Sequence, residues 1–231
     1  MAVDRAAVAE NRRRKTRRKL IEAALGVIAV KGFDGQIVDD VVRKAGVSRA
    51  TYYNYFKTST ELVLAIAEEL INELISLTIL SVDKNPLPFE RHATGARTFM
   101  SILRRYPRAA AFLSRTAYYS VRPGSFAYAV LERDVGGGME DGSFSKRRLA
   151  LAMDLVVGPI ISTMGRMATE NVPQSEIDDV VYAMLLALGA DPDRARRALA
   201  ITLAHPRASK GSLLEQTEAL DRISLAGGVT G

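Results

Sequence analysis

Side chains that can read DNA bases gather in the segment from Val38 to Phe56, VDDVVRKAGVSRATYYNYF. Arginine can pair with guanine and asparagine with adenine, while threonine can contact a thymine methyl group or a phosphate. Arg49, Asn54 and Thr51 are therefore candidate DNA contacts, and the polar Ser48 lies directly before them. The segment favours binding to a nucleic acid over transformation of a substrate.

Patterns typical of enzymes or metal sites do not stand out. The chain contains no cysteine, which excludes a disulfide framework, a Cys-based zinc site and a thiol nucleophile. His92 and His205 are far apart and lack metal-ligand spacing, so we expect surface or capping roles for them. An enzyme would need a catalytic site assembled from scattered residues. We predict a protein that is not an enzyme and that uses no metal and no cofactor.

Positive charge is concentrated in the first quarter of the chain. The whole chain has a net charge of +6, and residues 1–60 carry 13 Lys and Arg against 6 Asp and Glu. Residues 61–231 carry 19 Lys and Arg against 20 Asp and Glu. A segregated basic segment is the electrostatic footprint of a nucleic-acid-binding module. We expect the basic side chains Arg14, Arg17 and Arg18 to contact DNA phosphates or the minor groove. The alternative is that this segment is a disordered tail that keeps the protein soluble.

Helical periodicity predicts the elements that hold these side chains. The segment from Thr16 to Val30 predicts a first helix with one apolar stripe. The side chains of this stripe are Leu20, Ala24, Val27 and Ile28. A second helix spans Asp39 to Ala45, Gly46 suits a left-handed turn, and Ser48 suits the N-cap of a third helix that runs to about Phe56. This pair of helices predicts a helix-turn-helix whose second helix enters the major groove.

Residues 16 to about 62 resemble the TetR family of repressors. The resemblance is carried by Gly32-Phe33, Ala45-Gly46-Val47-Ser48 and Thr51-Tyr52-Tyr53-Asn54-Tyr55-Phe56. It implies nine or more helices, dimerisation through two late helices, and release of DNA when a small molecule enters the C-terminal domain. It also implies phosphate contacts by Tyr53 and Tyr55, while Tyr52 and Phe56 face the core.

The segment departs from the family pattern at two places. Ile37 stands where the family usually has a threonine, so that N-cap is missing and Gln36 or Asp39 is the candidate substitute. Ser59 stands where the family has a lysine that contacts a phosphate, and Lys57 is the candidate to take over that contact.

The rest of the chain predicts a larger helical domain. Thr58 and Glu61 form a capping box that starts a fourth helix, and the breaker from Asp83 to Pro88 ends it. The run from Gly136 to Gly142 lacks the features of a phosphate-binding loop, and we expect a flexible loop there. We predict an all-α protein of about ten helices. Its parts are a basic flexible arm (1–15), a helix-turn-helix domain (16–58), a connecting helix (59–82), a ligand-binding and dimerisation domain (83–205) and a tail with one possible short helix (206–231).

Apolar side chains of the larger domain are candidates for a pocket and for a dimer interface. Those expected at the pocket, with an ordinary core role as the alternative, are Phe99, Leu103, Phe112, Tyr118, Met153, Val157 and Met164. Helices expected at about 145–170 and 175–189 have more apolar surface than one bundle face requires, which favours a four-helix dimer interface. The residues expected there are Val156, Ile160, Ile177, Val181, Met184 and Leu188.

The function we expect is that of a repressor. It binds a pseudo-palindromic double-stranded operator as a homodimer, and a small apolar or amphipathic effector releases it. An architectural DNA-binding protein or an activator without ligand control is the alternative. The N-terminus lacks the apolar stretch of a signal peptide, and Asp154 interrupts the apolar stretch from Leu149 to Met164. We therefore expect a cytoplasmic protein that does not bind a membrane.

Overall fold

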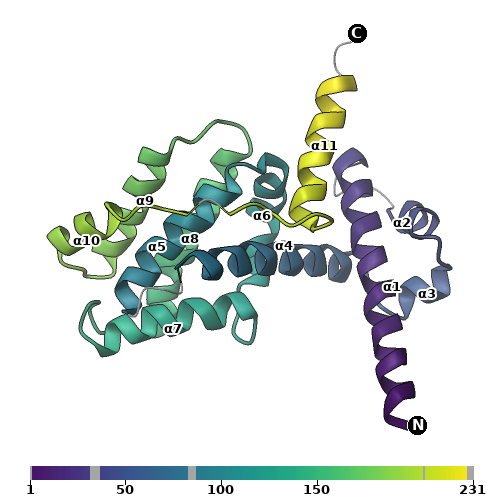
Figure 1. Ribbon diagram of the computed structural model, residues 1–231, viewed down its shortest axis with the longest axis horizontal. Coiled ribbons are helices and arrows are strands. Elements are labelled where there is room, and N and C mark those ends of the chain that lie inside the picture. The colour runs from purple at the N-terminus through teal and green to yellow at the C-terminus, as the bar shows by residue number, and fades with distance from the viewer. Residues whose placement is uncertain (1, 32–36, 83–86, 205, 228–231) are drawn as a thin grey trace. The chain divides into compact units, whose positions relative to one another are not determined.

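The computed structural model describes all residues except 1, 32–36, 83–86, 205 and 228–231. Within the described ranges the chain forms eleven α-helices and no strand, which confirms the all-α prediction (Figure 1). The chain divides into two compact units. One comprises Met1–Ile66 with Ala219–Gly231, and the other comprises Ala67–Glu218.

The first unit is built on the long helix α1 (Ala2–Lys31). The predicted apolar stripe is confirmed, because Leu20, Ala24, Val27 and Ile28 are all buried. The sequence predicts a flexible arm over residues 1–15, but the structure extends α1 back to Ala2. No glycine or proline precedes Gly26, and the arm is rich in alanine and arginine, which favour a helix. A basic segment need not be a flexible one.

Helices α2 (Val38–Ala45) and α3 (Arg49–Tyr53) form the predicted helix-turn-helix. Gly46 adopts a left-handed conformation with φ of 64°, where a side chain would be strained. Ser48 caps α3 as predicted, since its hydroxyl accepts a hydrogen bond of 3.1 Å from the Thr51 backbone N–H. Ile37 precedes α2 and gives no side-chain cap. Gln36 and the Gly32-Phe33 motif lie outside the described residues.

Helix α4 (Ser59–Val82) begins at the predicted capping box. The Thr58 hydroxyl accepts a hydrogen bond of 3.1 Å from the Glu61 backbone N–H, and the Glu61 carboxylate accepts one from the Lys57 N–H. Residues 59–66 of this helix belong to the first unit and residues 67–82 to the second.

The second unit continues with six helices. These are α5 (Pro88–Leu103), α6 (Pro107–Ser120), α7 (Phe126–Glu140), α8 (Leu149–Met167), α9 (Gln174–Ala187) and α10 (Pro192–Leu199). Helix α5 packs against α7, α9 and α10, while α6 packs against α8. Asp191 caps α10, since its carboxylate accepts a hydrogen bond of 2.8 Å from the Arg194 N–H. Helix α9 begins at Gln174, directly after Pro173, and has no side-chain cap.

Two buried or half-buried arginines join helices that are distant in sequence. Arg97 of α5 pairs with Asp178 of α9 at 2.9 Å and donates a hydrogen bond of 2.8 Å to the Ile201 carbonyl. Arg194 of α10 pairs with Glu90 of α5 at 3.1 Å, and its guanidinium lies 4.3 Å from the centre of the Phe89 ring. These contacts fix α5 against the last two helices of the bundle.

Helix α7 runs through the three glycines Gly136, Gly137 and Gly138, so the prediction of a flexible loop there is wrong. A Cβ atom on Gly138 would lie 2.3 Å from the Phe144 ring, and one on Gly137 would lie 3.0 Å from Pro88. Close packing therefore requires small residues at these positions, and tertiary contacts override the weak helix propensity of glycine.

The tail contains the predicted additional helix, α11 (Leu213–Gly227). Ser212 caps it through a hydrogen bond of 3.1 Å from the Glu215 N–H. The Glu73 carboxylate of α4 accepts hydrogen bonds of 3.0 Å from the N–H groups of both Leu213 and Leu214. A carboxylate at a helix N-terminus is favourable because backbone N–H groups there lack partners within the helix.

Helix α8 is the one described helix whose length and composition alone would allow it to cross a membrane. Its buried side chains, which include Met153, Val156 and Met164, pack within the helical bundle. Leu151 on the same helix is half exposed. Outside its buried face, α8 therefore exposes both an apolar side chain, Leu151, and the charged Asp154.

Candidate DNA-binding surface and ligand cavity

The base-reading candidates lie on the outer side of α3. Arg49, the first residue of the helix, forms a two-pronged ion pair with Asp39 of α2, at 2.6 Å from Nε to Oδ1 and 2.5 Å from Nη2 to Oδ2. The hydroxyl oxygens of Thr51 and Ser48 are 2.9 Å apart. Asn54 is exposed at the end of α3. The structure thus brings Arg49, Thr51 and Asn54 together on one short helix and assigns Ser48 a capping role.

Helix α3 ends at Tyr53, short of the predicted end at about Phe56, and the aromatic residues in and directly after it divide between core and surface as the sequence indicates. Tyr52 and Phe56 are buried, whereas Tyr53 is 44% exposed and Tyr55 is partly exposed. Lys57 donates a hydrogen bond of 3.2 Å from its Nζ to the Tyr53 carbonyl, which holds its ammonium group beside the end of α3.

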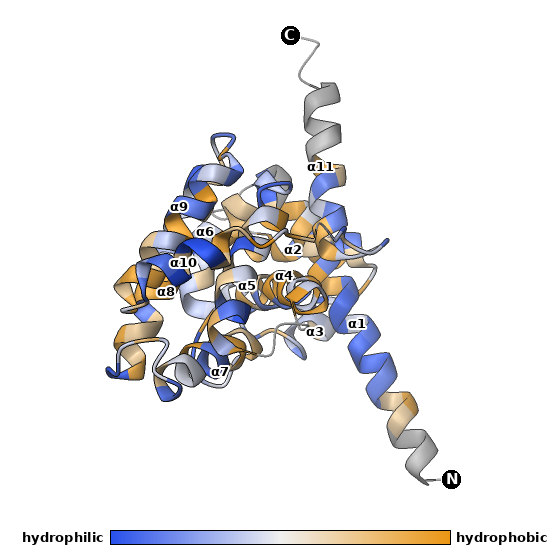
Figure 2. Cartoon of the chain, turned by 60° about the vertical axis from the view of Figure 1, so that its left-hand side comes forward, coloured by the Kyte–Doolittle hydropathy of each residue, from blue (hydrophilic) through white to orange (hydrophobic). Residues whose placement is uncertain are grey.

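Helix α1 adds basic side chains beside α3. Arg12 and Arg13 line a shallow hollow together with Thr51 and Tyr55. The N-terminal half of α1 therefore lies next to α3, the helix that carries the base-reading candidates and is called the reading helix below. Arg14 is exposed on the same half, in which Figure 2 shows hydrophilic turns and, nearer the N-terminus, a short apolar stretch. The other two predicted contacts have partners within the chain. The Arg17 guanidinium lies 5.7 Å from the centre of the Phe56 ring, and Arg18 pairs with Glu22 at 2.8 Å.

The acidic residues at the start of α2 are neutralised by cations. The hydrogen bond from Lys31, helped by Arg43, lowers the pKa of the Asp40 carboxyl below its usual value. The hydrogen bond with Asp39 raises the pKa of the Arg49 guanidinium. Both carboxylates are therefore paired with cations, so they oppose the approach of a phosphate less than free carboxylates would.

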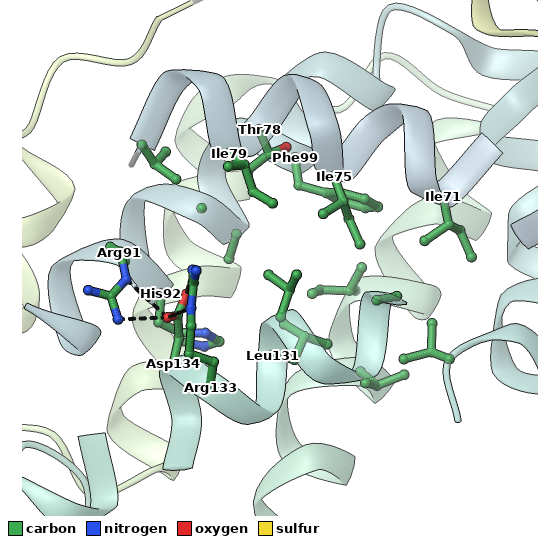
Figure 3. Close-up of a pocket in the computed structure, with 18 of the residues that line it drawn as sticks. Ile71, Ile75, Thr78, Ile79, Arg91, His92, Phe99, Leu131, Arg133 and Asp134 are labelled. Carbon is green, nitrogen blue, oxygen red and sulfur yellow. Dashed lines mark hydrogen bonds and ion pairs between the residues drawn. The ribbon is translucent and has the colours of Figure 1, made fainter. Parts of the chain in front are cut away.

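The second unit contains an apolar cavity of about 90 Å³. Helices α4 to α8 supply its walls (Figure 3). Ile71, Ile75 and Ile79 of α4 form one wall, and Phe99 of α5 and Leu131 of α7 face them. The cavity is therefore enclosed mainly by branched and aromatic side chains, as is typical of sites for small apolar molecules.

One end of this cavity is polar. Asp134 of α7 accepts hydrogen bonds from Arg91 of α5 at 2.9 Å and from Arg133 at 2.8 Å, and His92 lies beside this cluster (Figure 3). His92 is 3% exposed, and burial lowers its pKa to about 4, with the nearby Asp134 opposing the shift. The sequence predicts a surface or capping role for His92, and this prediction is wrong; His205 lies outside the described residues.

Comparison with known proteins identifies part of the first unit. Residues 20–66 match the family model of bacterial regulatory proteins of the tetR family. Residues 20–66 are a tetR-type DNA-binding domain. The uncharacterized HTH-type transcriptional regulator YvdT of Bacillus subtilis is 40% identical over 57 residues, which are 25% of this chain and 29% of YvdT. The regulator CymR of Pseudomonas putida is 45% identical over 60 residues, 26% of this chain and 30% of CymR.

Known structures extend the similarity from the tetR-type domain to the helical fold of the rest. RolR in complex with resorcinol has a TM-score of 0.60 and 22% identity, and the match covers 87% of this chain and 100% of RolR. FadR from Bacillus subtilis in complex with stearoyl-CoA has a TM-score of 0.51 and 18% identity, with 73% of this chain and 97% of FadR covered. At these identities the similarity shows a shared fold.

The pocket residues expected from the sequence are only partly at the cavity. Phe99, Val157 and Met164 line it. Leu103, Phe112 and Met153 are instead buried in the core, and Tyr118 is 72% exposed. Helical periodicity separates apolar from polar faces, but it cannot distinguish a side chain that lines a cavity from one that packs fully.

The residues expected at a dimer interface lie mostly inside one protomer. Val156, Ile177, Val181, Met184 and Leu188 are 0–1% exposed, and Ile160 lines the cavity. Side chains already covered by their own chain are not available to a partner. The apolar side chains that α8 and α9 leave exposed are different ones, among them Leu151 and Leu186.

Several functional candidates were not predicted from the sequence. The ion pairs of Arg91 and Arg133 with Asp134 join positions that carry no motif. The α4 wall of the cavity has a readable signal, because Ile71, Ile75 and Ile79 recur every four residues as a second apolar stripe. A helix with two apolar stripes must be covered on two sides.

Proposed function

We propose that this protein is a cytoplasmic transcriptional repressor that binds operator DNA as a homodimer and releases it when a small apolar or amphipathic molecule enters the cavity. The observation that carries the proposal is the tetR-type domain, with Arg49, Thr51 and Asn54 on the outer side of its reading helix. These side chains can pair with base edges in the major groove. Arg14, Tyr53, Tyr55 and Lys57 are the proposed phosphate contacts.

The apolar outer faces of α8 and α9 support a homodimer. Leu151 of α8 is 51% exposed and Leu186 of α9 is 37% exposed, and Figure 2 shows long hydrophobic stretches on both helices. A second copy of the chain would cover these faces in a four-helix interface. Two-fold symmetry then requires a pseudo-palindromic operator.

The cavity supports control by a ligand. It is apolar with one polar end, and the related folds of RolR and FadR carry resorcinol and stearoyl-CoA in their structures. A ligand weakens DNA binding only if it binds the DNA-free conformation more tightly than the DNA-bound one. We propose that helix α4 transmits the effect of the ligand to the reading helix, because α4 starts shortly after that helix and its later residues line the cavity.

The experiment that tests DNA reading is selection of bound sequences from random double-stranded DNA by the full-length protein. We expect a pseudo-palindrome, and replacement of Arg49 by alanine should reduce the preference at one base pair per half-site by about tenfold. Arg196→Ala is a matched control, since Arg196 is an exposed arginine of α10. Recovery of no consensus sequence by the wild-type protein would favour an architectural DNA-binding protein instead.

A further inference from the structure

The polar end of the cavity contains an unsatisfied nitrogen. His92 lies on α5 with its ring edge-on to Phe144, at 5.8 Å between ring centres. Its Nε2 atom is buried and has no hydrogen-bond partner within the described part of the chain. Buried polar atoms without partners are rare in folded proteins, because they lose hydrogen bonds to water without replacement. Figure 3 shows the His92 ring among the side chains that line the cavity.

The charged groups around His92 already satisfy one another. The Asp134 carboxylate is held by the guanidinium groups of Arg91 and Arg133, both within 3.0 Å. Because burial keeps the pKa of His92 at about 4, its imidazole is neutral near pH 7. A neutral imidazole nitrogen either accepts or donates one hydrogen bond, depending on the tautomer.

These conditions select the chemistry of a ligand. A hydroxyl group both donates and accepts, so it can pair with Nε2 in either tautomer. A carboxylate only accepts, so it pairs with Nε2 in one tautomer only, and it would lose its hydration in a mostly apolar cavity whose two guanidinium groups already bind Asp134. The remaining walls, which include Ile75, Phe99 and Met164, are mostly apolar, and the Thr78 hydroxyl among them already donates a hydrogen bond to the Leu74 carbonyl.

The size of the cavity limits the ligand further. Its volume is about 90 Å³. An apolar protein cavity of about 150 Å³ is known to accept benzene, so a single ring requires only a modest outward movement of side chains here. A long acyl chain would require far more rearrangement.

We propose that the cavity binds a small uncharged molecule of one ring, a phenol or a cyclic alcohol, whose hydroxyl group pairs with His92 Nε2. This inference rests on the proposed ligand control for its biological role, and it adds the chemical class of the ligand and the residue that selects it.

Phenol and toluene are suitable probes because they have nearly the same shape and differ in the hydroxyl group. Dissociation constants for both are measured by ligand-observed NMR on the full-length protein without DNA. We expect wild-type protein to prefer phenol over toluene by about tenfold more than the His92→Phe variant does, as expected for one hydrogen bond to a buried group. Equal preference in the two proteins would overturn the proposal, and so would tighter binding of benzoate than of phenol by the wild type.

A second variant guards against misfolding of His92→Phe. Gly95 lines the cavity, and a Cβ atom there would lie 4.0 Å from Thr78, so Gly95→Ala adds a methyl group without a clash. This variant should weaken phenol and toluene binding by the same factor. Unchanged binding of both probes would show that they bind elsewhere, and this result would overturn the proposal.

Titration of phenol into a complex of protein and selected DNA separates this proposal from the proposed function. Phenol binding that depends on His92 but leaves DNA affinity unchanged would refute ligand-controlled repression and leave the site intact. Specific DNA binding without any phenol binding would refute the site and leave the DNA-binding function intact.

Discussion

The two units of the molecule hold their ion pairs in different surroundings. In the tetR-type domain, Arg49 and Asp39 are ten residues apart in sequence, and their side chains are 64% and 58% exposed. In the second unit, Arg97 and Asp178 are 81 residues apart, and their side chains are 6% and 27% exposed. Exposed pairs contribute little to stability, whereas removal of one partner from a buried pair is strongly destabilising. The pair of Arg49 and Asp39 shapes a surface, whereas the pair of Arg97 and Asp178 holds distant helices together.

The largest effect that this comparison predicts is at Arg97. Replacement by alanine should lower the free energy of unfolding by about 3 kcal/mol, because Asp178 loses its charged partner and the Ile201 carbonyl loses its donor. Urea unfolding at fixed protein concentration measures the change. Arg196→Ala is the control, because Arg196 and Asp193 are 67% and 76% exposed and should contribute at most about 0.5 kcal/mol. Equal losses in the two variants would remove the distinction between buried and exposed pairs.

The glycines of α7 give a matched pair of substitutions. Gly138→Ala should destabilise the protein by about 2 kcal/mol, because its Cβ atom would lie 2.3 Å from the Phe144 ring. Gly136→Ala should stabilise it by about 0.5–1 kcal/mol, since no atom lies within 4 Å of the added Cβ and alanine favours a helix. Thermal unfolding of both variants tests this, and two changes of the same sign would contradict the packing described here.

The neutral state of His92 predicts a dependence of stability on pH. The pKa of His92 is about 4 in the folded state against 6.5 in the unfolded chain. Below about pH 6.5 the unfolded state therefore binds more protons, and the free energy of unfolding decreases as the pH is lowered. The loss from pH 7 to pH 5.5 should be about 1 kcal/mol. His92→Phe should lack this contribution while keeping the rest of the pH profile. Superimposable profiles would indicate that folding does not lower the pKa of His92.

The smallest effect is expected in the tetR-type domain. The Tyr52 hydroxyl is buried and has no hydrogen-bond partner in the described structure, so Tyr52→Phe should leave stability unchanged or raise it by up to about 0.5 kcal/mol. DNA affinity should stay at the wild-type level. Tyr53→Phe is the counterpart, since it removes an exposed hydroxyl and should weaken DNA binding without a change in stability. Weaker DNA binding by Tyr52→Phe with no change in DNA binding by Tyr53→Phe would contradict the core role of Tyr52 and the surface role of Tyr53.

The helix-turn-helix was largely predictable because its determinants are close in sequence. The Ser48 cap, the Gly46 turn and the division between Tyr52 and Tyr53 all follow from residues within a few positions of each other. The pair of Arg49 with Asp39 was missed, because a loop and the turn geometry decide whether two charges ten residues apart meet.

The cavity was poorly predictable for the opposite reason. His92 becomes a cavity residue only because α5, α7 and the Phe144 segment converge on it, and no motif records that convergence. The same holds for the interface prediction, where periodicity found apolar helices but not which face the bundle already covers. Val156 and Leu151 are equally apolar, yet one is fully buried and the other is half exposed.

The glycine run of α7 has a consequence for the kinetics of ligand entry. Each glycine in a helix reduces its stability by about 1 kcal/mol relative to alanine, so the end of α7 depends on packing against Pro88 and Phe144. Asp134 lies two residues before this run, and Ala127, Val130 and Leu131 of the same helix form part of the cavity wall. Segments of low local stability open transiently while the rest of the fold stays intact. Amide protons at the end of α7 should therefore exchange with solvent faster than those of α5, and an enclosed ligand would enter and leave through this wall.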